Sequence, residues 1–180
     1  MASLYLDESL DASAFAVGST LSIEGDDARH AVQVARVKVG ERIAIGDGRG
    51  RIARGAVIEA SPRSVAIHID EIEDSPLPTP RIRLVQALAK GDRDELAVQA
   101  ATELGVAEVV PWAATRSISR WDGAKAQRGR ARWATIAREA AKQSIRSTVP
   151  LVAELATTAA IARLGGLVLV LDPAGSEPIS

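Results

Sequence analysis

The segment from Arg81 to Trp112 constrains the fold of this chain most, because its pattern is that of a strand, a helix and a second strand. Residues 82–88 are almost continuously apolar, which is typical of a strand covered on both faces. Asp92 is the expected helix start and Gly105 the expected helix end. Residues 106–112 form the second predicted strand. A helix between two such strands favours a right-handed crossover and a parallel sheet, so we predict an α/β domain.

The predicted helix has one apolar stripe, which we expect to face the sheet. The stripe consists of Leu96, Ala97, Ala100, Ala101 and Leu104. The Asp92 carboxylate is expected to accept hydrogen bonds from free N–H groups of the first turn, and Glu95 is expected to complete a capping box.

Residues 1–73 have a different pattern, that of short strands separated by turns. Strands are predicted at residues 42–46, 50–60 and 64–72. Asp26 or Asp27 is expected to cap a short helix at residues 31–37. This combination predicts a small, partly closed β-barrel or a strongly bent sheet, with the helix at one end.

Residues 74–80 contain three prolines in seven residues, a composition that neither a helix nor a central strand accommodates. We therefore place the domain boundary in this segment. It is the expected linker between a barrel at residues 1–73 and an α/β domain at residues 81–180.

Three features of the first domain have a structural and a functional interpretation. The sequence GDGRG at residues 46–50 lies between two predicted strands. A dinucleotide-binding loop would lie between a strand and a helix, so we interpret this motif as a hairpin turn. His68 falls on the polar face of its strand and is predicted to be a surface residue. For His30, packing or capping is the commoner explanation.

The second predicted parallel strand is followed by a polar loop at residues 115–123, which contains Arg116, Arg120 and Trp121. Ligands of parallel sheets collect beyond the carboxyl ends of the strands, so this loop is a candidate edge of a site. The remaining predicted elements are helices at residues 124–147 and 157–164 and strands at residues 151–152 and 167–171.

The composition limits the chemistry of the chain. The absence of Cys excludes disulfides, thiolate catalysis and Cys-ligated zinc, and two His residues argue against a multi-histidine metal site. No apolar run approaches the roughly 20 residues that cross a bilayer. We therefore expect a cytoplasmic protein without a metal and without membrane contact.

The charge of the chain is distributed unevenly, although the net charge is only -1. Residues 116–146 contain 9 basic and 2 acidic side chains, a net charge of +7. Such a block is typical of a protein that binds a polyanion. The alternative is a solvated helix face without a nucleic-acid partner.

Several motifs, taken in order, resemble one family. They are HAVQVARVKVGERIAIGDGRG, KGDRDELAVQAATELGVAEVVPW, TRSISRWDG and RWATIAREAAKQSIRSTVP. Together they span about residues 20–175 and resemble the small-subunit ribosomal RNA (uracil-N3)-methyltransferase family of the SPOUT class. The resemblance implies an N-terminal PUA-like β-barrel that helps to hold RNA, followed by a SPOUT-type parallel α/β methyltransferase domain that forms a homodimer.

The same resemblance implies a reaction, a cofactor and a partner. A methyl group would pass from S-adenosyl-L-methionine to N3 of one uridine of 16S ribosomal RNA near the decoding centre. The partner would be this RNA or the small ribosomal subunit, and the chemistry needs no metal.

The family's recurrent polar positions fall in both predicted domains. They are His30, Arg36, Asp47, Lys90, Glu103, Arg116, Arg132, Glu139, Gln143, Ser144 and Arg146. With Arg120 of the polar loop, the expected RNA-contacting residues are His30, Arg36, Lys90, Arg116, Arg132 and Arg146. Glu103 and Glu139 are interpreted as ion-pair partners, and no residue is assigned to catalysis.

The chain departs from the family at its C-terminal end. The family's cofactor-binding knot contains a GPEGG loop and an LGxRILRxETA segment, and neither occurs here. The expectation is therefore an incomplete SPOUT-type domain that lacks the knot, in a C-terminally truncated chain. Leu171 and Asp172 would form at most one rim of the cofactor site, so cofactor binding by this chain would be weak.

Two other functions remain open at this point. One is a non-enzymatic RNA-binding or ribosome-assembly module. The other is an unrelated α/β enzyme whose basic helix binds acidic metabolites, although no Walker or dinucleotide signature supports it.

Overall fold

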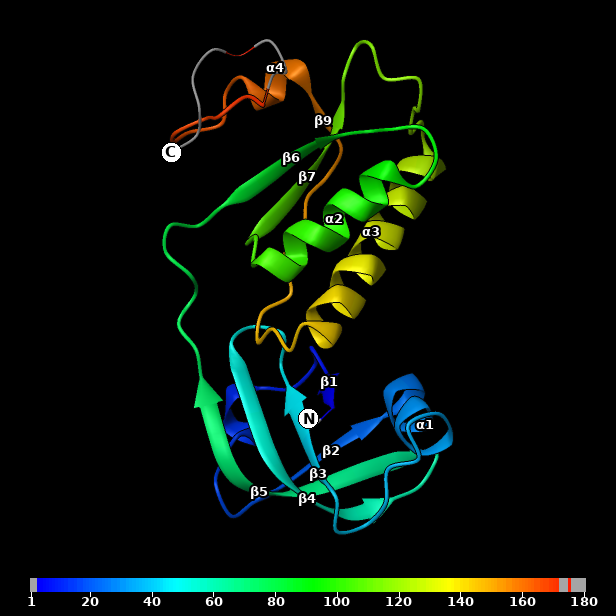
Figure 1. The fold of residues 1–180 in the computed structure, drawn as a ribbon, viewed down its shortest axis with the longest axis vertical. Helices are drawn as coiled ribbons and strands as arrows, with labels where there is room; N and C mark the ends of the chain where they lie inside the picture. Colours follow the sequence, from blue (N-terminus) through cyan, green and yellow to red (C-terminus); the bar gives the residue numbers. More distant parts are fainter. Residues whose placement is uncertain (1–2, 172–174, 176–180) are drawn as a thin grey trace.

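The computed structural model describes residues 3–171 and 175, which form two sheets joined by an extended segment (Figure 1). Strand β5 ends at Asp74 and strand β6 begins at Arg83, and the residues between them belong to no helix or strand. The division into two domains with a proline-rich linker fits this arrangement and stays a prediction.

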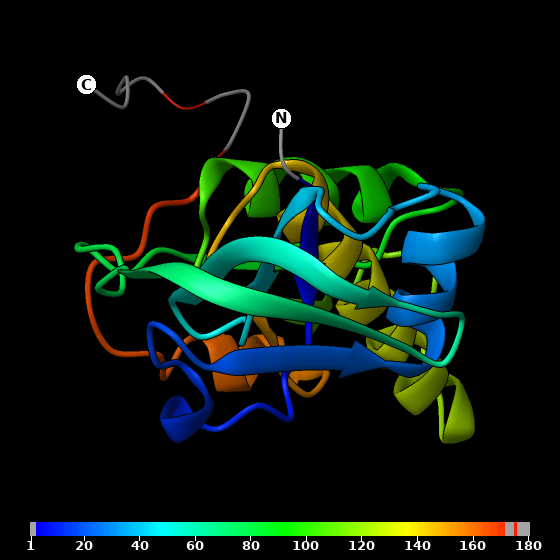
Figure 2. The same cartoon turned by 90° about the horizontal axis from the view of Figure 1, so that it is seen from below.

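The first sheet has five strands in the order β1-β3-β4-β5-β2. These strands are β1 (Leu4–Leu6), β2 (Thr20–Glu24), β3 (Arg42–Gly46), β4 (Arg51–Ala60) and β5 (Ser64–Asp74). β1 pairs with β3 in parallel and the other pairs are antiparallel. Figure 2 shows how strongly the long strands bend. The sequence's alternative of a strongly bent sheet describes this part, whereas a closed PUA-like barrel stays a proposal.

Two register irregularities in the β4–β5 pair, at Arg54/Gly55 and Val57/Glu59, accompany this bend. The two strands approach closely at Gly55, where a Cβ atom would lie 2.0 Å from the carbonyl oxygen of His68. Only glycine fits there. The curvature encloses a core of Tyr5, Ile23, Ile45, Val57 and Ile67, each at most 2% exposed.

One short helix, α1 (Gly25–Gln33), packs beside this sheet through Ala28 and Ala31, and a 3-10 turn, η1 (Ala12–Ala14), precedes β2. The helix prediction was six residues late at its start, because Asp26 and Asp27 lie in the first turn and do not cap it. The helix ends before Arg36, which has a positive φ of 57°.

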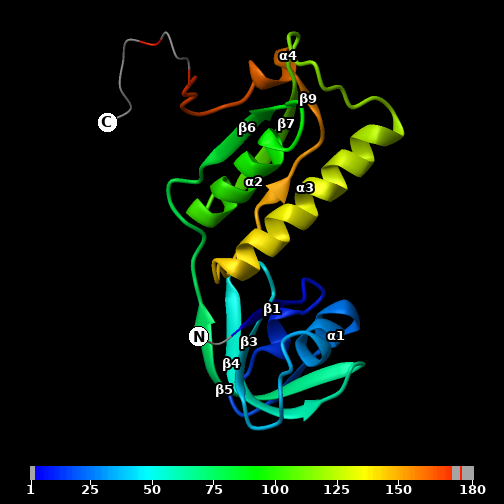
Figure 3. The same ribbon diagram turned by 45° about the vertical axis from the view of Figure 1, so that its right-hand side comes forward.

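The second sheet is parallel, as predicted, with β6 (Arg83–Ala87), β7 (Glu108–Ala113) and β8 (Leu151–Val152) in that order. A further short strand, β9 (Ala156–Thr157), also pairs in parallel with β7. Helices α2 (Arg93–Leu104) and α3 (Ala124–Gln143) pack side by side on the same side of the sheet (Figures 1 and 3), and α4 (Thr158–Ile161) follows β9. Their shared core contains Val98, Val109, Trp133 and Ala137, all at most 1% exposed.

The predicted apolar stripe of α2 was wrong in most of its residues, although Ala101 does pack against the core. Leu96 and Leu104 are 56% and 84% exposed, and the buried residues are Asp94, Val98 and Thr102. These three lie four residues apart and so share one face of the helix. The two polar side chains are buried at low cost because Asp94 accepts hydrogen bonds from backbone N–H groups and Thr102 donates to the Val98 carbonyl.

Three other element predictions need correction. Residues 167–171 form no strand and are 55–88% exposed, since an apolar run becomes a strand only when a sheet edge pairs with it. The long helix ends at Gln143, before residue 147, because Ile145 takes a positive φ of 55° and the Arg146 N–H turns back to the Ala141 carbonyl. Strand β6 is only half-buried, with Ile82 before it 61% exposed.

The C-terminal end of α3 packs against the first sheet (Figure 3). Leu4, Leu6, Ala44 and Ile52 of the sheet form one buried cluster with Ala141 of α3. The GDGRG segment is the predicted hairpin turn between β3 and β4, and it adds backbone contacts to this interface. The Gly50 N–H donates to the Ser147 carbonyl at 2.9 Å, and the Val149 N–H donates to the Gly48 carbonyl at 2.8 Å.

An ionic cluster completes the interface. The carboxylate of Asp27 accepts hydrogen bonds from Arg138 at 2.5 Å and from Lys142 at 3.0 Å. Burial alone would raise the pKa of Asp27, but the two hydrogen bonds and the two positive charges lower it below the ordinary value of 3.8. Asp27 and Lys142 have side chains only 16% and 10% exposed, so each needs the other as a partner.

We predict that Asp27→Asn lowers the free energy of unfolding by about 3 kcal/mol at pH 7, because Arg138 and Lys142 lose their one largely buried carboxylate and keep only the exposed Glu8 and Glu139. The folded-state pKa of Asp27 is depressed, so its contribution is complete above about pH 4 and is lost as the pH falls through the folded pKa. The difference between wild type and variant, measured by urea unfolding, should therefore shrink in acid. Asp26→Asn is the matched control, since Asp26 pairs only with exposed Arg29. A difference that does not change with pH would contradict this assignment.

Candidate functional site

Three parallel strands end at the same edge of the second sheet. β6 ends at Ala87, β7 at Ala113 and β9 at Thr157. The segments that follow the first two of these ends carry Lys90, Arg116 and Arg120, all exposed. The structure therefore brings three of the predicted RNA-contacting residues to one edge, the carboxyl edge, where ligands of parallel sheets bind.

The turn that carries Lys90 is fixed by Asp94. One carboxylate oxygen of Asp94 accepts the Ala89 N–H at 3.0 Å, and the other accepts the Glu95 N–H at 2.9 Å. The predicted capping by Asp92 and Glu95 was wrong, because Asp92 makes no capping hydrogen bond and Glu95 pairs with Arg132. A buried Asp94 thus holds the turn while the Lys90 side chain stays in solvent.

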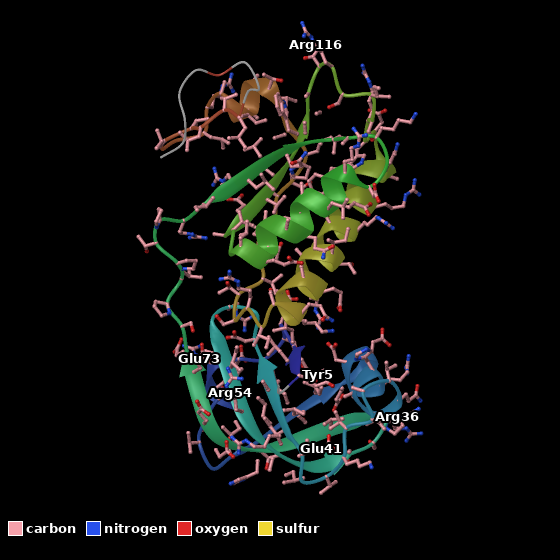
Figure 4. All side chains as sticks on the ribbon, viewed as in Figure 1. Tyr5, Arg36, Glu41, Arg54, Glu73 and Arg116 are labelled. Atoms are coloured by element: carbon pink, nitrogen blue, oxygen red, sulfur yellow. The ribbon has the colours of Figure 1, made fainter. Side chains whose placement is uncertain are left out.

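The loop that carries Arg116 and Arg120 is anchored through Trp121. Its ring packs edge-on against the buried Trp133, with 5.0 Å between ring centroids. It also lies directly over Gly129 of α3, where a Cβ atom would be 2.4 Å from the Trp121 ring. The loop is therefore fixed at its C-terminal end, and Figure 4 shows Arg116 extending from it into solvent.

The predicted RNA-contacting residues of α3 and its C-terminal turn have partners within the protein. Arg132 forms a two-pronged pair with Glu95, and Arg146 donates to the Glu103 carbonyl at 2.6 and 3.0 Å. The side chain of Arg132 remains 68% exposed, and its pKa is raised by the Glu95 hydrogen bond. Contact of Arg132 and Arg146 with RNA stays a prediction.

His30 and Arg36 lie at the C-terminal end of α1 and just beyond it, and both are exposed. Figure 4 places Arg36 at the opposite end of the molecule from Arg116. The predicted residues therefore form separate groups on the two sheets, and the structure does not gather them into one pocket.

Four of the other recurrent polar positions have structural roles. Asp47 is 1% exposed and accepts the N–H groups of Arg49 and Arg51, which closes the hairpin turn. Glu139 pairs with Lys142 at 3.1 Å, as expected of an ion-pair partner. The same expectation was wrong for Glu103, whose side chain accepts from Gln99 and pairs with no cation of the described residues. Ser144 donates to the Ala140 carbonyl. Asp27 was missed as the partner of Arg138, because residues more than 100 positions apart carry no local signal.

The cofactor role of Leu171 and Asp172 stays a prediction. Leu171 is 80% exposed, and Asp172 lies outside the described residues. Within residues 3–171, no cluster of three His, Asp or Glu side chains could hold a metal ion, and no helix is both long and apolar enough to cross a membrane.

The contact between Trp121 and Gly129 gives a testable prediction. In most helices Gly→Ala stabilises by about 1 kcal/mol. Here we expect Gly129→Ala to yield no such gain and to change tryptophan fluorescence, because the new methyl group displaces Trp121. In a Trp121→Ala background, the same substitution should stabilise by about 1 kcal/mol in urea unfolding. Equal effects of Gly129→Ala in both backgrounds would show that Trp121 does not occupy this position.

Two sequence profiles match the chain. The profile of the RNA methyltransferase domain matches residues 75–180, and that of the RNA methyltransferase PUA domain matches residues 23–70. The ribosomal RNA small subunit methyltransferase E of Mycobacterium bovis is 36% identical over 169 residues, which cover 90% of this chain and 64% of that protein. The chain thus spans less than two thirds of the length of this relative.

Solved structures agree with these matches. The ribosomal RNA small subunit methyltransferase E of Neisseria gonorrhoeae, crystallised with S-adenosyl methionine, is 29% identical, with a TM-score of 0.74 over 86% of this chain and 62% of that one. A structure from Legionella pneumophila has a TM-score of 0.84 over 98% of this chain and 73% of that one, and its 23% identity supports the fold alone. Because the first profile covers more than half of its residues, the chain belongs to the RNA methyltransferase family.

Proposed function

We propose that the chain acts in the S-adenosyl-L-methionine-dependent methylation of 16S ribosomal RNA, at N3 of a uridine near the decoding centre. The observation that carries this proposal is the placement of Lys90, Arg116 and Arg120 on anchored segments at one carboxyl edge of the parallel sheet. The similarity to ribosomal RNA small subunit methyltransferase E proteins supports the substrate class.

The chemistry proposed for these residues is electrostatic. A uracil must lose its N3 proton before N3 can act as a nucleophile, and the resulting anion is stabilised by nearby fixed cations. A cation on an anchored turn, such as Lys90, needs little reorganisation to do this. Arg116 and Arg120 would hold backbone phosphates and fix the register of the RNA without reading its sequence.

The first sheet has a supporting role in this proposal. His30 and Arg36 would contact RNA that flanks the target, in a PUA-like barrel, while Arg132 and Arg146 would add contacts along α3. We further propose that the protein acts in the cytoplasm, on the small ribosomal subunit, as a homodimer. Leu171 and Asp172 would form at most one rim of the cofactor site.

A second function would use the same exposed cations without a cofactor. The chain would then be an RNA-binding or ribosome-assembly module without methyl transfer. The two functions differ in one measurable property: only the first predicts binding of S-adenosyl-L-methionine.

The test uses small ribosomal subunits that lack the modification and S-adenosyl-L-methionine with an isotopically labelled methyl group. The chain is assayed alone and fused to the C-terminal third of the Mycobacterium bovis relative. We expect labelled N3-methyluridine in the RNA, and a loss of about tenfold in kcat/KM for Arg116→Ala, the equivalent of one phosphate contact of about 1.4 kcal/mol. Arg42→Ala, which removes a cation from an exposed pair with Asp70, is the control. RNA binding without labelled product from either protein would favour the assembly module.

A further inference from the structure

A groove of about 760 Å³ lies between the first sheet and α3. One wall is the β3–β4 turn with Gly48 and Arg49, and the other is the face of α3 that carries Arg130, Thr135 and Arg138. None of the RNA-contacting residues predicted from the sequence lines it. Its volume lies in the range of about 300–1,000 Å³ that is usual for ligand sites.

Three guanidinium groups line this groove, and each donates to a backbone carbonyl oxygen; for Arg138 this is the carbonyl of Leu6. Arg49 donates to the carbonyls of Glu8 and Leu10, and Arg130 donates from Nε to the Val152 carbonyl at 2.9 Å. A carbonyl orients a guanidinium without neutralising its charge. Both side chains stay accessible, at 54% and 40% exposed.

The two acidic side chains that line the groove are exposed. Arg49 also lies 3.9 Å from the buried Asp47, and Arg138 also pairs with the largely buried Asp27. Glu154, which pairs with Arg130, has a side chain that is 80% exposed, and Glu8, which lies 3.3 Å from Arg138, is 53% exposed. Surface pairs of this kind contribute only about 0–1 kcal/mol. A phosphate could therefore replace Glu154 at Arg130 with little loss.

The groove is also lined by small and apolar residues. They are Ala131 and Ala134 of α3 and Val149, Pro150 and Leu151, of which Leu151 is 61% exposed. Cations beside apolar atoms suit a ligand with an anionic backbone and flat, weakly polar bases. This is the chemistry of a single RNA strand, since the bases of a duplex are paired with each other and are not free to contact such residues.

The groove follows α3 from Arg138 to Gln127, a length of about 16 Å at the helical rise of 1.5 Å per residue. Gln127 lies one turn from the start of α3, where the loop that carries Arg116 and Arg120 ends. A strand in the groove would therefore run from the hairpin turn of the first sheet towards the carboxyl edge of the second.

We propose that this groove binds a single-stranded segment of the RNA substrate, with Arg49 and Arg130 contacting its phosphates. The proposal rests on the function proposed above and assigns a substrate-binding surface to a place where both halves of the protein meet. The strand would connect RNA held by the first sheet to the target at the edge of the second.

The test measures binding of the 180-residue chain to a short fluorescein-labelled oligouridylate by anisotropy, between about 50 and 200 mM salt. Arg130→Ala should weaken binding about fivefold to tenfold and reduce the slope of log Kd against log salt by about 0.7, the value of one contact to a single strand. Glu154→Gln should tighten binding, because it frees Arg130. Unlabelled duplex RNA of the same length should compete poorly.

Arg42→Ala is the matched control, since it removes one cation from the far end of β3. If Arg130→Ala behaves like Arg42→Ala, or if Glu154→Gln weakens binding, the groove does not bind RNA, while the proposed function stands. If the wild-type chain binds no RNA at the lowest salt concentration, both proposals fail. Arg130→Ala is expected to weaken RNA binding and Glu154→Gln to tighten it. Because a loss of folding would weaken binding in both variants, the opposite effects distinguish a lost contact from a loss of folding.

Discussion

The carboxylate of Asp27, held between Arg138 and Lys142, is the interaction on which the arrangement of the two sheets depends. A largely buried carboxylate loses its hydration, and this loss is offset only when cations and hydrogen bonds replace the water. The two cations come from α3 and the carboxylate comes from α1, so the cluster is complete only when the two halves are docked. The apolar cluster that contains Leu6 and Ala141 also stabilises the docked arrangement. The backbone hydrogen bonds of the hairpin turn do the same.

This docking, and not the proline-rich segment, determines how the two sheets are placed relative to each other. The residues between β5 and β6 belong to no helix or strand and do not by themselves fix how the two sheets are placed. The contacts at α3 select one arrangement, in which the hairpin turn lies against the residues that follow the helix. Surfaces on the two halves then have a fixed spacing, which a substrate that contacts both of them requires.

The positions of the helices and strands were predicted better from the sequence than the faces of these elements that are buried. The strand, helix and strand of residues 82–112 and the hairpin at residues 46–50 were found because their signals are local. The buried face of α2 was missed because Asp94 and Thr102 satisfy their polar atoms within one turn, which hydrophobicity patterns do not record. The partners of α3 were missed for a different reason, since Asp27, Glu95 and Glu154 are distant in sequence and meet the helix only in the fold.

These partners neutralise part of the positive charge of residues 116–146. Arg130, Arg132, Arg138 and Lys142 all pair with carboxylates, whereas Arg116, Arg120, Lys125 and Arg128 make no ion pair with any residue in the described part of the chain. Four uncompensated cations thus lie in the loop and in the first turns of α3. Arg146, beyond the other end of the helix, donates only to the Glu103 carbonyl and makes no ion pair within the described residues. The N-terminal end of the helix has no acidic side chain in its first turn and no side-chain cap, so the helix dipole adds to the positive potential. A polyanion is therefore attracted most strongly to the end of α3 beside the carboxyl edge, and the paired cations nearer the first sheet contribute where a phosphate can displace their carboxylates.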